Sequence, residues 1–419
     1  MVASTDIKFY VHTNNSAPQL QNVYGSMIDV LNACLVNGIQ IGTVSSLTAS
    51  DSTVTAVFSA PHKLIQYQVI KITGANQAEF NGEHRVLTVP NSTTITFELV
   101  TLPEISTATG TISASLPPLG WEKPFSSSHA TVGGKAAYRS KNLLLSSRPF
   151  LRVVDEPDAA YATTYAKFAK VGIVEDMTDI DALLGVQAPY NSSNPNLNWV
   201  GTGSGTSAVN GWARWYYASS TESSNASYSI DYQAPTNGNC TWILVGTGDY
   251  FYIIPEVRVG YSAGFIYGFG SVDSLISVDN GNTFLSSTLN AKDASANTHN
   301  ILRTPLSADN TNYCLLHRNY KNEATYAIAN AKSFLSTVYS GYGNILSNDA
   351  YSGLSAFDVY ALEGSVLRAK FKNIKWLYSN LPYANLTTVS FGEQLFIAKN
   401  VAAMNGQIGQ VLLKLGDLS

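Results

Sequence analysis

The sequence predicts a mainly β protein of several domains, sandwich- or barrel-like, with one N-terminal amphipathic helix. Three observations lead to this fold class. Short runs in which apolar and polar residues alternate recur along the 419 residues, and this two-residue period is typical of half-buried strands. Asn-Gly and Pro residues separate many of the runs, as turns do between short strands. One stretch near the N-terminus changes to three- and four-residue spacing, the period of a helix.

The N-terminal segment predicts a strand followed by this helix. The strand is expected over 7–12. After Pro18, apolar residues recur at three- and four-residue steps from Leu20 to Leu35, and Asn37-Gly38 can end a helix. One face of the helix is therefore expected to be buried.

Residues 43–115 predict a small all-β module. Val54, Ala56 and Phe58 occupy alternate positions, and Asn81-Gly82 is a strong turn signal. Further strands are expected at 69–72, 86–89, 94–99 and 110–114. Short strands at this spacing indicate a small sandwich or barrel. Because the module begins and ends in a loop-like context, we expect it to be inserted into a β-rich body formed by 1–42 and 116–419.

The body is expected to fold as one unit or as two subdomains of about 116–190 and 191–419. A short helix is predicted over 176–184 and a polar surface loop over 191–211. Strands are predicted at 143–145, 150–154, 212–217, 242–245, 250–254, 367–371, 394–398 and 410–415. In the strand at 367–371, basic residues alternate with apolar ones, which predicts a basic outer face.

Charged residues are scarce. They make up 13% of the chain, with a formal net charge of −4, whereas a soluble domain usually carries about 25%. Hydrophobic residues reach 45%, too many for a disordered chain, and no basic excess is present to neutralise nucleic-acid phosphates. The surface is therefore expected to be neutral and rich in hydroxyl and amide groups, or covered by partners.

We expect no enzyme activity, no cofactor and no metal site. The glycines from Gly201 to Gly205 resemble a phosphate-binding loop only superficially, because no Lys-Ser/Thr pair follows. Cys314 and His317 have the spacing of half a zinc site, but no second pair lies nearby. The three cysteines are expected to be buried free thiols; they are Cys34, Cys240 and Cys314.

A group of acidic residues is the nearest approach to a catalytic or calcium-binding set. Its spacing does not match the twelve-residue calcium loop, and no clear pair of carboxylates for glycoside hydrolysis stands out. We therefore expect a solvated face. The group consists of Asp155, Glu156, Asp158, Glu175, Asp176, Asp179 and Asp181.

The N-terminus has no basic region followed by an apolar one, so no signal peptide is expected. The most apolar stretch, 242–272, is interrupted by Asp249, Glu256 and Arg258. It lacks the unbroken apolar span that a bilayer requires, and no membrane insertion is expected.

One aromatic cluster, Trp212, Trp215, Tyr216 and Tyr217, is a possible ligand-binding or interface surface. Exposed Trp and Tyr rings are used to bind carbohydrate and protein, because they supply contact area at low entropic cost. The alternative, which we favour, is a core strand whose rings point inward.

Sparse segments along the chain resemble known proteins. In the module the similar segments are 58–64, 69–74, 80–82, 86–89 and 93–97. In the body they are 8–12, 31–38, 120–121, 137–139, 242–245 and 376–382. The module resembles a small β-module that recurs in structural proteins of tailed bacteriophages, and the body resembles a family of uncharacterised tailed-phage virion proteins. In that family the Asn-Gly stop is followed almost directly by Gly-Trp, which agrees with an insertion at 43–115.

The resemblance implies a structural component of a tailed-phage particle, chiefly of its tail or baseplate. It would be made in the cytoplasm of the host bacterium and be located in the virion. Its partners would be other virion proteins and copies of itself, and not nucleic acid. Two alternatives remain: a receptor-binding or adhesion protein that recognises host-surface glycan, and a capsid decoration or head–tail collar protein. A polysaccharide depolymerase ranks last, because no β-helix repeat is present.

Overall fold

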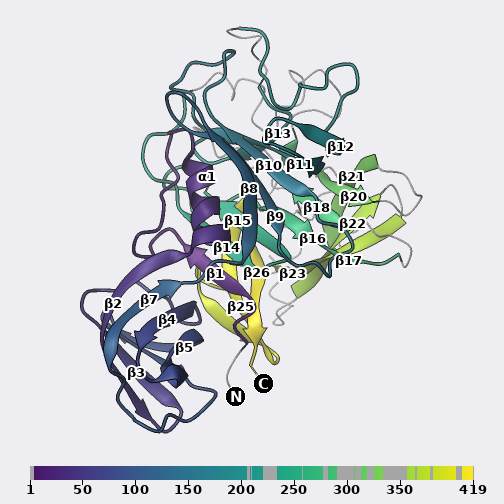
Figure 1. Cartoon of the computed structure of the whole chain (residues 1–419). Helices are drawn as coiled ribbons and strands as arrows, with labels where there is room; N and C mark the ends of the chain where they lie inside the picture. Colours follow the sequence, from purple (N-terminus) through teal and green to yellow (C-terminus); the bar gives the residue numbers. More distant parts are fainter. Residues whose placement is uncertain are drawn as a thin grey trace.

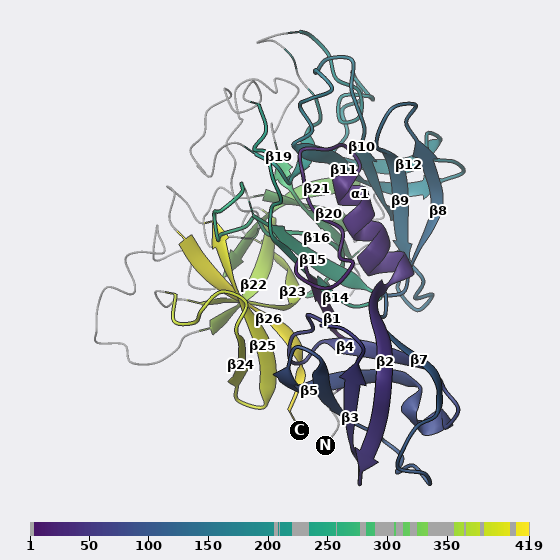
Figure 2. The ribbon, with the colours of Figure 1, turned by 90° about the vertical axis from the view of Figure 1, so that its left-hand side faces the viewer.

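In the computed structural model a small barrel lies at one end of the chain's fold, and two larger sheets with one short helix form the rest (Figures 1 and 2). All strand pairings described below are antiparallel. The structure describes residues 4–204, 208, 210–219, 234–256, 258–276, 282–289, 306, 313–318, 325–333, 356–363, 366–377, 381–402 and 408–418.

Six strands close the barrel in the order β2-β3-β6-β5-β4-β7. Alternation builds its interior: Val54, Ala56 and Phe58 are buried, whereas the neighbouring Thr53 and Thr55 are exposed. The predicted small β-module is thus a barrel. Its elements are β2 (Ile39–Ser50), β3 (Thr53–Phe58), β4 (Val69–Ala75), η2 (Ala78–Phe80), β5 (Gly82–Asn91), β6 (Thr94–Glu98) and β7 (Gly110–Leu116).

The chain enters and leaves the barrel at one point, because Ile39 of β2 pairs with Leu116 of β7. The barrel therefore takes in a few residues on either side of the expected module, 43–115. At the opposite end, Ser50 pairs with Thr53 across the β2–β3 turn. This end is the far end of the barrel, and it points away from the sheets (Figure 2).

Buried polar groups attach the barrel to the N-terminal strand. The amides of Asn14 and Gln68 bond to each other at 2.9 Å, and Gln68 also donates to the carbonyl of Phe9 at 3.1 Å. The guanidinium of Arg85, only 1% exposed, donates to the carbonyl of Ile7 at 3.1 Å. Because unpaired buried polar groups are costly, these bonds specify how the barrel sits on the body.

The smaller sheet has the order β19-β13-β11-β10-β9-β8, with β12 paired to β11, among the described residues. The predicted strand at 150–154 is confirmed as β10. These strands are β8 (Trp121–Ser128), β9 (Gly134–Ser140), β10 (Phe150–Asp155), β11 (Phe168–Met177), β12 (Leu183–Ala188), β13 (Ala213–Tyr216) and β19 (Thr288–Leu289).

The larger sheet has the order β1-β14-β15-β16-β18-β20-β21-β22-β23-β26-β25-β24 in the described part of the chain, with β17 paired to β23. Its strands are β1 (Lys8–Val11), β14 (Trp242–Gly246), β15 (Tyr250–Pro255), β16 (Tyr267–Ser271), β17 (Asp273–Ser274), β18 (Thr283–Ser286), β20 (Tyr313–Arg318), β21 (Thr325–Ser333), β22 (Ala356–Glu363), β23 (Val366–Leu377), β24 (Thr388–Phe391), β25 (Gln394–Ala402) and β26 (Ile408–Asp417). The predicted strands at the N-terminus and at 242–245, 250–254, 367–371, 394–398 and 410–415 are confirmed.

Three local predictions were wrong. The helix α1 (Ser26–Leu31), continued by the π-helix η1 (Asn32–Asn37), begins well after Pro18, because Leu20 pairs with Cys240 as a β-bridge. Residues 143–145 form a loop, in which Leu144 is 93% exposed. Residues 176–184 are not helical, since β11 continues to Met177 and a turn leads into β12.

The cysteines Cys34, Cys240 and Cys314 are buried free thiols, as predicted. Among the described residues, no helix combines the length and the apolar character needed to cross a membrane.

A buried carboxyl group attaches α1 to the smaller sheet. Asp155, at the end of β10, is fully buried. Its oxygens accept a hydrogen bond from the N–H of Met27 at 3.1 Å and one from the hydroxyl of Tyr217 at 2.7 Å. Burial raises the pKa of Asp155 from its ordinary 3.8 to about 7, although the hydrogen bonds from Tyr217, Met27 and Gly25 lower it in part.

Asp155 predicts a specific pH dependence of stability. Because its pKa is higher in the folded chain than in the unfolded one, its contribution to the free energy of unfolding is fully present below about pH 4 and is lost as the pH rises to about 7. Asp155→Asn keeps an acceptor for the N–H of Met27, places an amide N–H where Asp155 accepted from the Tyr217 hydroxyl, and does not titrate. Urea unfolding of the variant between these pH values should therefore show a smaller fall in stability than the wild type.

The control is Asp51→Asn, which removes an exposed carboxyl from the β2–β3 turn. Equal pH dependence of wild type and Asp155→Asn would contradict the assignment of this fall to Asp155.

Candidate functional site

The aromatic cluster lies in the interior, as the core alternative predicted. Trp212 is 7% exposed, Tyr216 is 2% exposed, and Trp215 and Tyr217 are fully buried. The indole of Trp215 stacks on Tyr267 of the opposite sheet, with ring centroids 5.9 Å apart. The expectation of a ligand-binding or interface surface at these four residues is therefore corrected: their side chains are buried and are not presented to a glycan.

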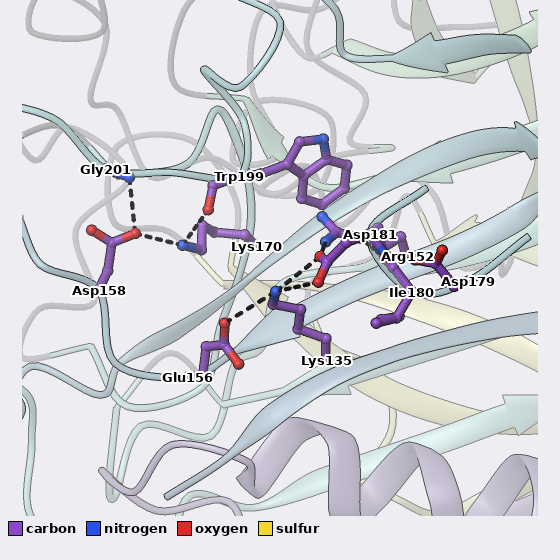
Figure 3. A network of polar contacts seen from close by, with 10 residues as sticks. All are labelled: Lys135, Arg152, Glu156, Asp158, Lys170, Asp179, Ile180, Asp181, Trp199 and Gly201. Carbon is purple, nitrogen blue, oxygen red and sulfur yellow. Dashed lines mark hydrogen bonds and ion pairs between the residues drawn. The ribbon is translucent and has the colours of Figure 1, made fainter. Parts of the chain in front are cut away.

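Part of the acidic group departs from the expected solvated face, whereas Asp176, Asp179 and Asp181 are exposed as expected. Asp155 is buried, and the Asp158 carboxylate, 7% exposed, forms an ion pair with the Lys170 ammonium at 2.8 Å. Arg152 and Lys135 both bind Asp181, at 2.7 and 2.8 Å. Figure 3 shows Asp158, Lys170, Arg152, Lys135 and Asp181 together over one face of the smaller sheet. On this face, basic residues on β9, β10 and β11 pair with acids from turns, whereas Asp155 is hydrogen-bonded by Met27 and Tyr217.

The pair of Asp158 and Lys170 holds a loop in place. Burial lowers the pKa of Lys170, and the neighbouring Asp158 carboxylate opposes this. Burial acts to raise the pKa of Asp158, but the Lys170 charge and the N–H groups of Ala160 and Gly201 bring it below its ordinary value. The Lys170 ammonium also donates to the carbonyl of Trp199 at 2.7 Å. Every charge named here has a partner, so the network is suited to holding the loop rather than to binding a ligand.

The expected surface loop at 191–211 is partly an interior segment; some of its residues lie outside the described ones. Trp199 is 6% exposed, and the Arg152 guanidinium lies 4.5 Å from its ring centroid. The ring packs directly on Gly172 of β11, where any Cβ would lie 2.6 Å from the Trp199 ring. Asn198 donates to the carbonyl of Val171 at 2.8 Å. The loop is thus packed across β11.

Cys314 and His317 are not gathered with further metal-ligating side chains in the part of the chain that the structure describes. His317 faces Ser147 at 3.1 Å and Glu175 at 3.7 Å, and Cys314 is buried in the core. Within the ranges that the structure describes, no group of three or more His, Cys, Asp or Glu side chains could hold a metal ion.

A cavity of about 300 Å³ lies beside β23 and is the candidate ligand site. We call it the lysine pocket. Charged and amide side chains dominate its lining, and Phe371, Ile374 and Phe396 complete it. The charged and amide residues are Asp273, Asp358, Lys370, Lys372, Asn373, Lys375, Gln394 and Lys414.

A change of strand partners opens the lysine pocket. The edge of β23 pairs with β17 at Ala369 and Lys370, and with β26 from Ile374 to Leu377. On the other edge, Tyr360 pairs with Lys370 and Asp358 pairs with Lys375. The two partners are two residues apart on β22 but five residues apart on β23, so β23 contains extra residues between them. A bulge with these extra residues bends a strand away from the regular ladder.

Buried tyrosines of β15 hold the bulge. The hydroxyl of Tyr252 donates to the carbonyl of Lys372 at 2.8 Å, and Asn373 donates to the hydroxyl of Tyr250 at 2.6 Å. Asn373 has a φ of 58°, in the left-handed region that Asn tolerates better than most residues. The bulge also shifts the alternation: Ala369 and Phe371 are buried before it, and Ile374 and Trp376 after it. Lys372 and Lys375 therefore both face the pocket.

The sequence pattern indicated only part of this site. Alternation over 367–371 predicted the basic outer face that carries Lys370. Lys414 and Asp273 were missed, because they reach the pocket only through the pairing of β26 and β17 with β23. Lys414, a charged residue on the otherwise apolar predicted strand 410–415, could have indicated that this strand contributes to the site.

The packing of Trp199 on Gly172 leads to a prediction about stability. Gly172→Ala introduces a Cβ that must displace the Trp199 ring, so we expect the free energy of unfolding to fall by about 1–3 kcal/mol, the usual cost of overpacking. Urea denaturation measures it. The control is Gly416→Ala in β26, where the nearest atom to an added Cβ is 3.8 Å away. Equal stabilities of the two variants would contradict the close packing of Trp199 on β11.

Comparisons with known proteins do not assign a family. No family model matches the chain, and no curated protein matches it. Among solved structures, the chain shows a likeness to a phage phi92 endosialidase, with 7% identity and a TM-score of 0.15. The match covers 91% of this chain and 52% of that one, so the chain spans about half the length of the endosialidase. A superposition this poor carries no argument about fold or activity.

Proposed function

We propose that the chain is a non-enzymatic structural subunit of a tailed-phage particle, located in its tail or baseplate. It acts by assembling with other virion proteins and with copies of itself. The resemblance of its segments to phage virion proteins supports this role, as does the low share of charged residues. The observation that carries the proposal is a group of exposed apolar side chains at the far end of the barrel.

Three large apolar side chains are exposed at the far end of the barrel, on the connection between β6 and β7. Val100 is 89% exposed, Leu102 is 64% exposed and Ile105 is 57% exposed. We call these three residues the barrel tip. An exposed cluster of large apolar side chains is typical of a protein-binding surface.

Backbone hydrogen bonds hold the segment that carries the barrel tip. The N–H of Leu99 donates to Ser52 at 2.8 Å, and the N–H of Ala49 donates to Ser106 at 2.7 Å. Farther along, the N–H of Ala108 donates to Leu47 at 3.0 Å. The apolar side chains are thus displayed by backbone that is tied to β2 and to the β2–β3 turn, which lowers the entropy lost on docking.

Charge around the barrel tip indicates the chemistry of its partner. Asp51, Glu98 and Glu104 lie on the turn and on the segment beside it, whereas residues 43–61 and 92–109 contain no Lys or Arg. Complementary charge favours specific association. We therefore propose a neighbouring virion protein whose docking surface is apolar at the centre and basic at the rim.

Adhesion to host-surface glycan through Trp212, Trp215, Tyr216 and Tyr217 is not part of the proposal, because these side chains are buried.

The barrel tip can be tested in particles. The triple change Val100→Ser, Leu102→Ser and Ile105→Ser alters exposed side chains only, so the chain should fold as before. Loss of three docked apolar side chains should lower incorporation into particles by roughly tenfold or more. Quantitative mass spectrometry of purified particles measures the incorporation, and circular dichroism checks the fold.

The matched control is Leu143→Ser with Leu144→Ser, two leucines that are 78% and 93% exposed on the body. The control should be incorporated like the wild type. A folded triple variant that enters particles at the wild-type copy number would overturn the docking role of the barrel tip.

A further inference from the structure

We propose that the lysine pocket is a binding site for a compact anionic group that presents phosphate or carboxylate oxygens. The inference goes beyond assembly and does not rest on it. Three observations carry it: the charge balance of the pocket, the way its lysines are held, and its size.

The charge balance favours an anion. Lys370 and Lys372 share a single carboxylate, that of Asp273, at 4.0 and 3.8 Å. These distances are long for ion pairs, and the Asp273 side chain is 48% exposed. The two ammonium groups therefore lack close carboxylate partners among the described residues, and an anion with several oxygens could bind both in charge-assisted hydrogen bonds.

The other two lysines add to the positive potential. Lys375 is paired with Asp358 at 2.6 Å, and Lys414 with Asp417 at 2.8 Å. Asp417 does not line the cavity. Four ammonium groups thus line the pocket against the two carboxylates of Asp273 and Asp358, a local balance of 4 − 2 = +2. Excess charge of one sign in a concave site concentrates ligands of the opposite sign.

Three of the four lysines are held rather than free in solvent, whereas the Lys370 side chain is 37% exposed. The side chains of Lys372 and Lys375 are each 24% exposed, and that of Lys414 is 16% exposed. The Lys372 ammonium also donates to the hydroxyl of Ser271 at 3.0 Å. Because the Tyr252 hydroxyl fixes the backbone of the same residue, part of the ordering cost of binding is already met before a ligand arrives.

The size and lining of the pocket limit the ligand. A cavity of about 300 Å³ lies at the lower end of the range for small-molecule sites. The side chain of Gln394 offers an amide to polar groups, whereas Phe371 and Phe396, which also line the cavity, are each only 1% exposed. These groups suit a phosphate or an acidic sugar unit better than a long apolar ligand.

The test uses the full chain and three probes in isothermal titration calorimetry: inorganic phosphate, glucuronate and neutral glucose. We expect millimolar or tighter binding of phosphate or glucuronate and none of glucose. Binding of phosphate alone identifies a phosphate-type ligand, and binding of glucuronate alone identifies an acidic sugar. Affinity should fall as NaCl rises from about 50 to about 500 mM, because partly exposed charges are screened.

Variants connect the binding to the pocket. Lys370→Gln with Lys372→Gln should weaken it roughly tenfold, the usual scale for losing charge-assisted bonds. Asp273→Asn should strengthen it several-fold, because the competing carboxylate is gone. The control is Lys141→Gln, an exposed lysine on the loop after β9, which should bind like the wild type.

Two results would overturn the proposal. One is the absence of binding by both anions to the folded wild type. The other is binding that Lys370→Gln with Lys372→Gln leaves unchanged while the variant keeps its native circular dichroism spectrum.

Discussion

The packing of Phe251 between two tryptophans is the contact on which the arrangement of the two sheets depends. Phe251 lies on β15 of the larger sheet. Trp121 and Trp215, from β8 and β13 of the smaller sheet, approach it edge-on with ring centroids 5.4 and 6.1 Å away. Each indole N–H also crosses to the larger sheet's side: Trp121 donates to the carbonyl of Thr247 at 2.9 Å and Trp215 to that of Ser286 at 2.8 Å. Buried area and directional bonds therefore specify the same geometry.

Two groups of charged side chains lie outside this aromatic core. The same hydrophobic cluster continues from Trp215 through α1 into the barrel, and the guanidinium of Arg85, buried in the barrel, donates to backbone carbonyls. Over the smaller sheet, ion pairs such as that of Asp158 and Lys170 hold a loop. At β23, the lysine pocket keeps an excess of positive charge. The first set stabilises the fold, and only the second is open to a ligand.

Local pattern was sufficient wherever a strand has one buried face. The alternation of Val54, Ala56 and Phe58 predicted β3, and the spacing of apolar residues predicted that α1 buries one side. The start of α1 could not be predicted, because the bridge between Leu20 and Cys240 joins residues far apart in sequence. The prediction of a strand at 143–145 was wrong for a related reason. Three adjacent leucines are apolar enough for a strand, but no neighbouring strand pairs with them in the described structure.

The sites depended even more on tertiary structure. The burial of Asp155 and Asp158 follows from partners on α1 and β11, which a run of acidic residues does not reveal. The lysine pocket needs the bulge in β23, and the bulge needs the hydroxyls of Tyr250 and Tyr252 from another strand. The sequence therefore indicated a basic strand face but not a cavity.

The central claim, that this chain is a part of a phage particle, is tested most directly by quantitative mass spectrometry of purified particles of the virus that encodes it. The account predicts a fixed ratio of this chain to the other structural proteins in every preparation. Absence of the chain from purified particles, or an amount that washing removes, would contradict it.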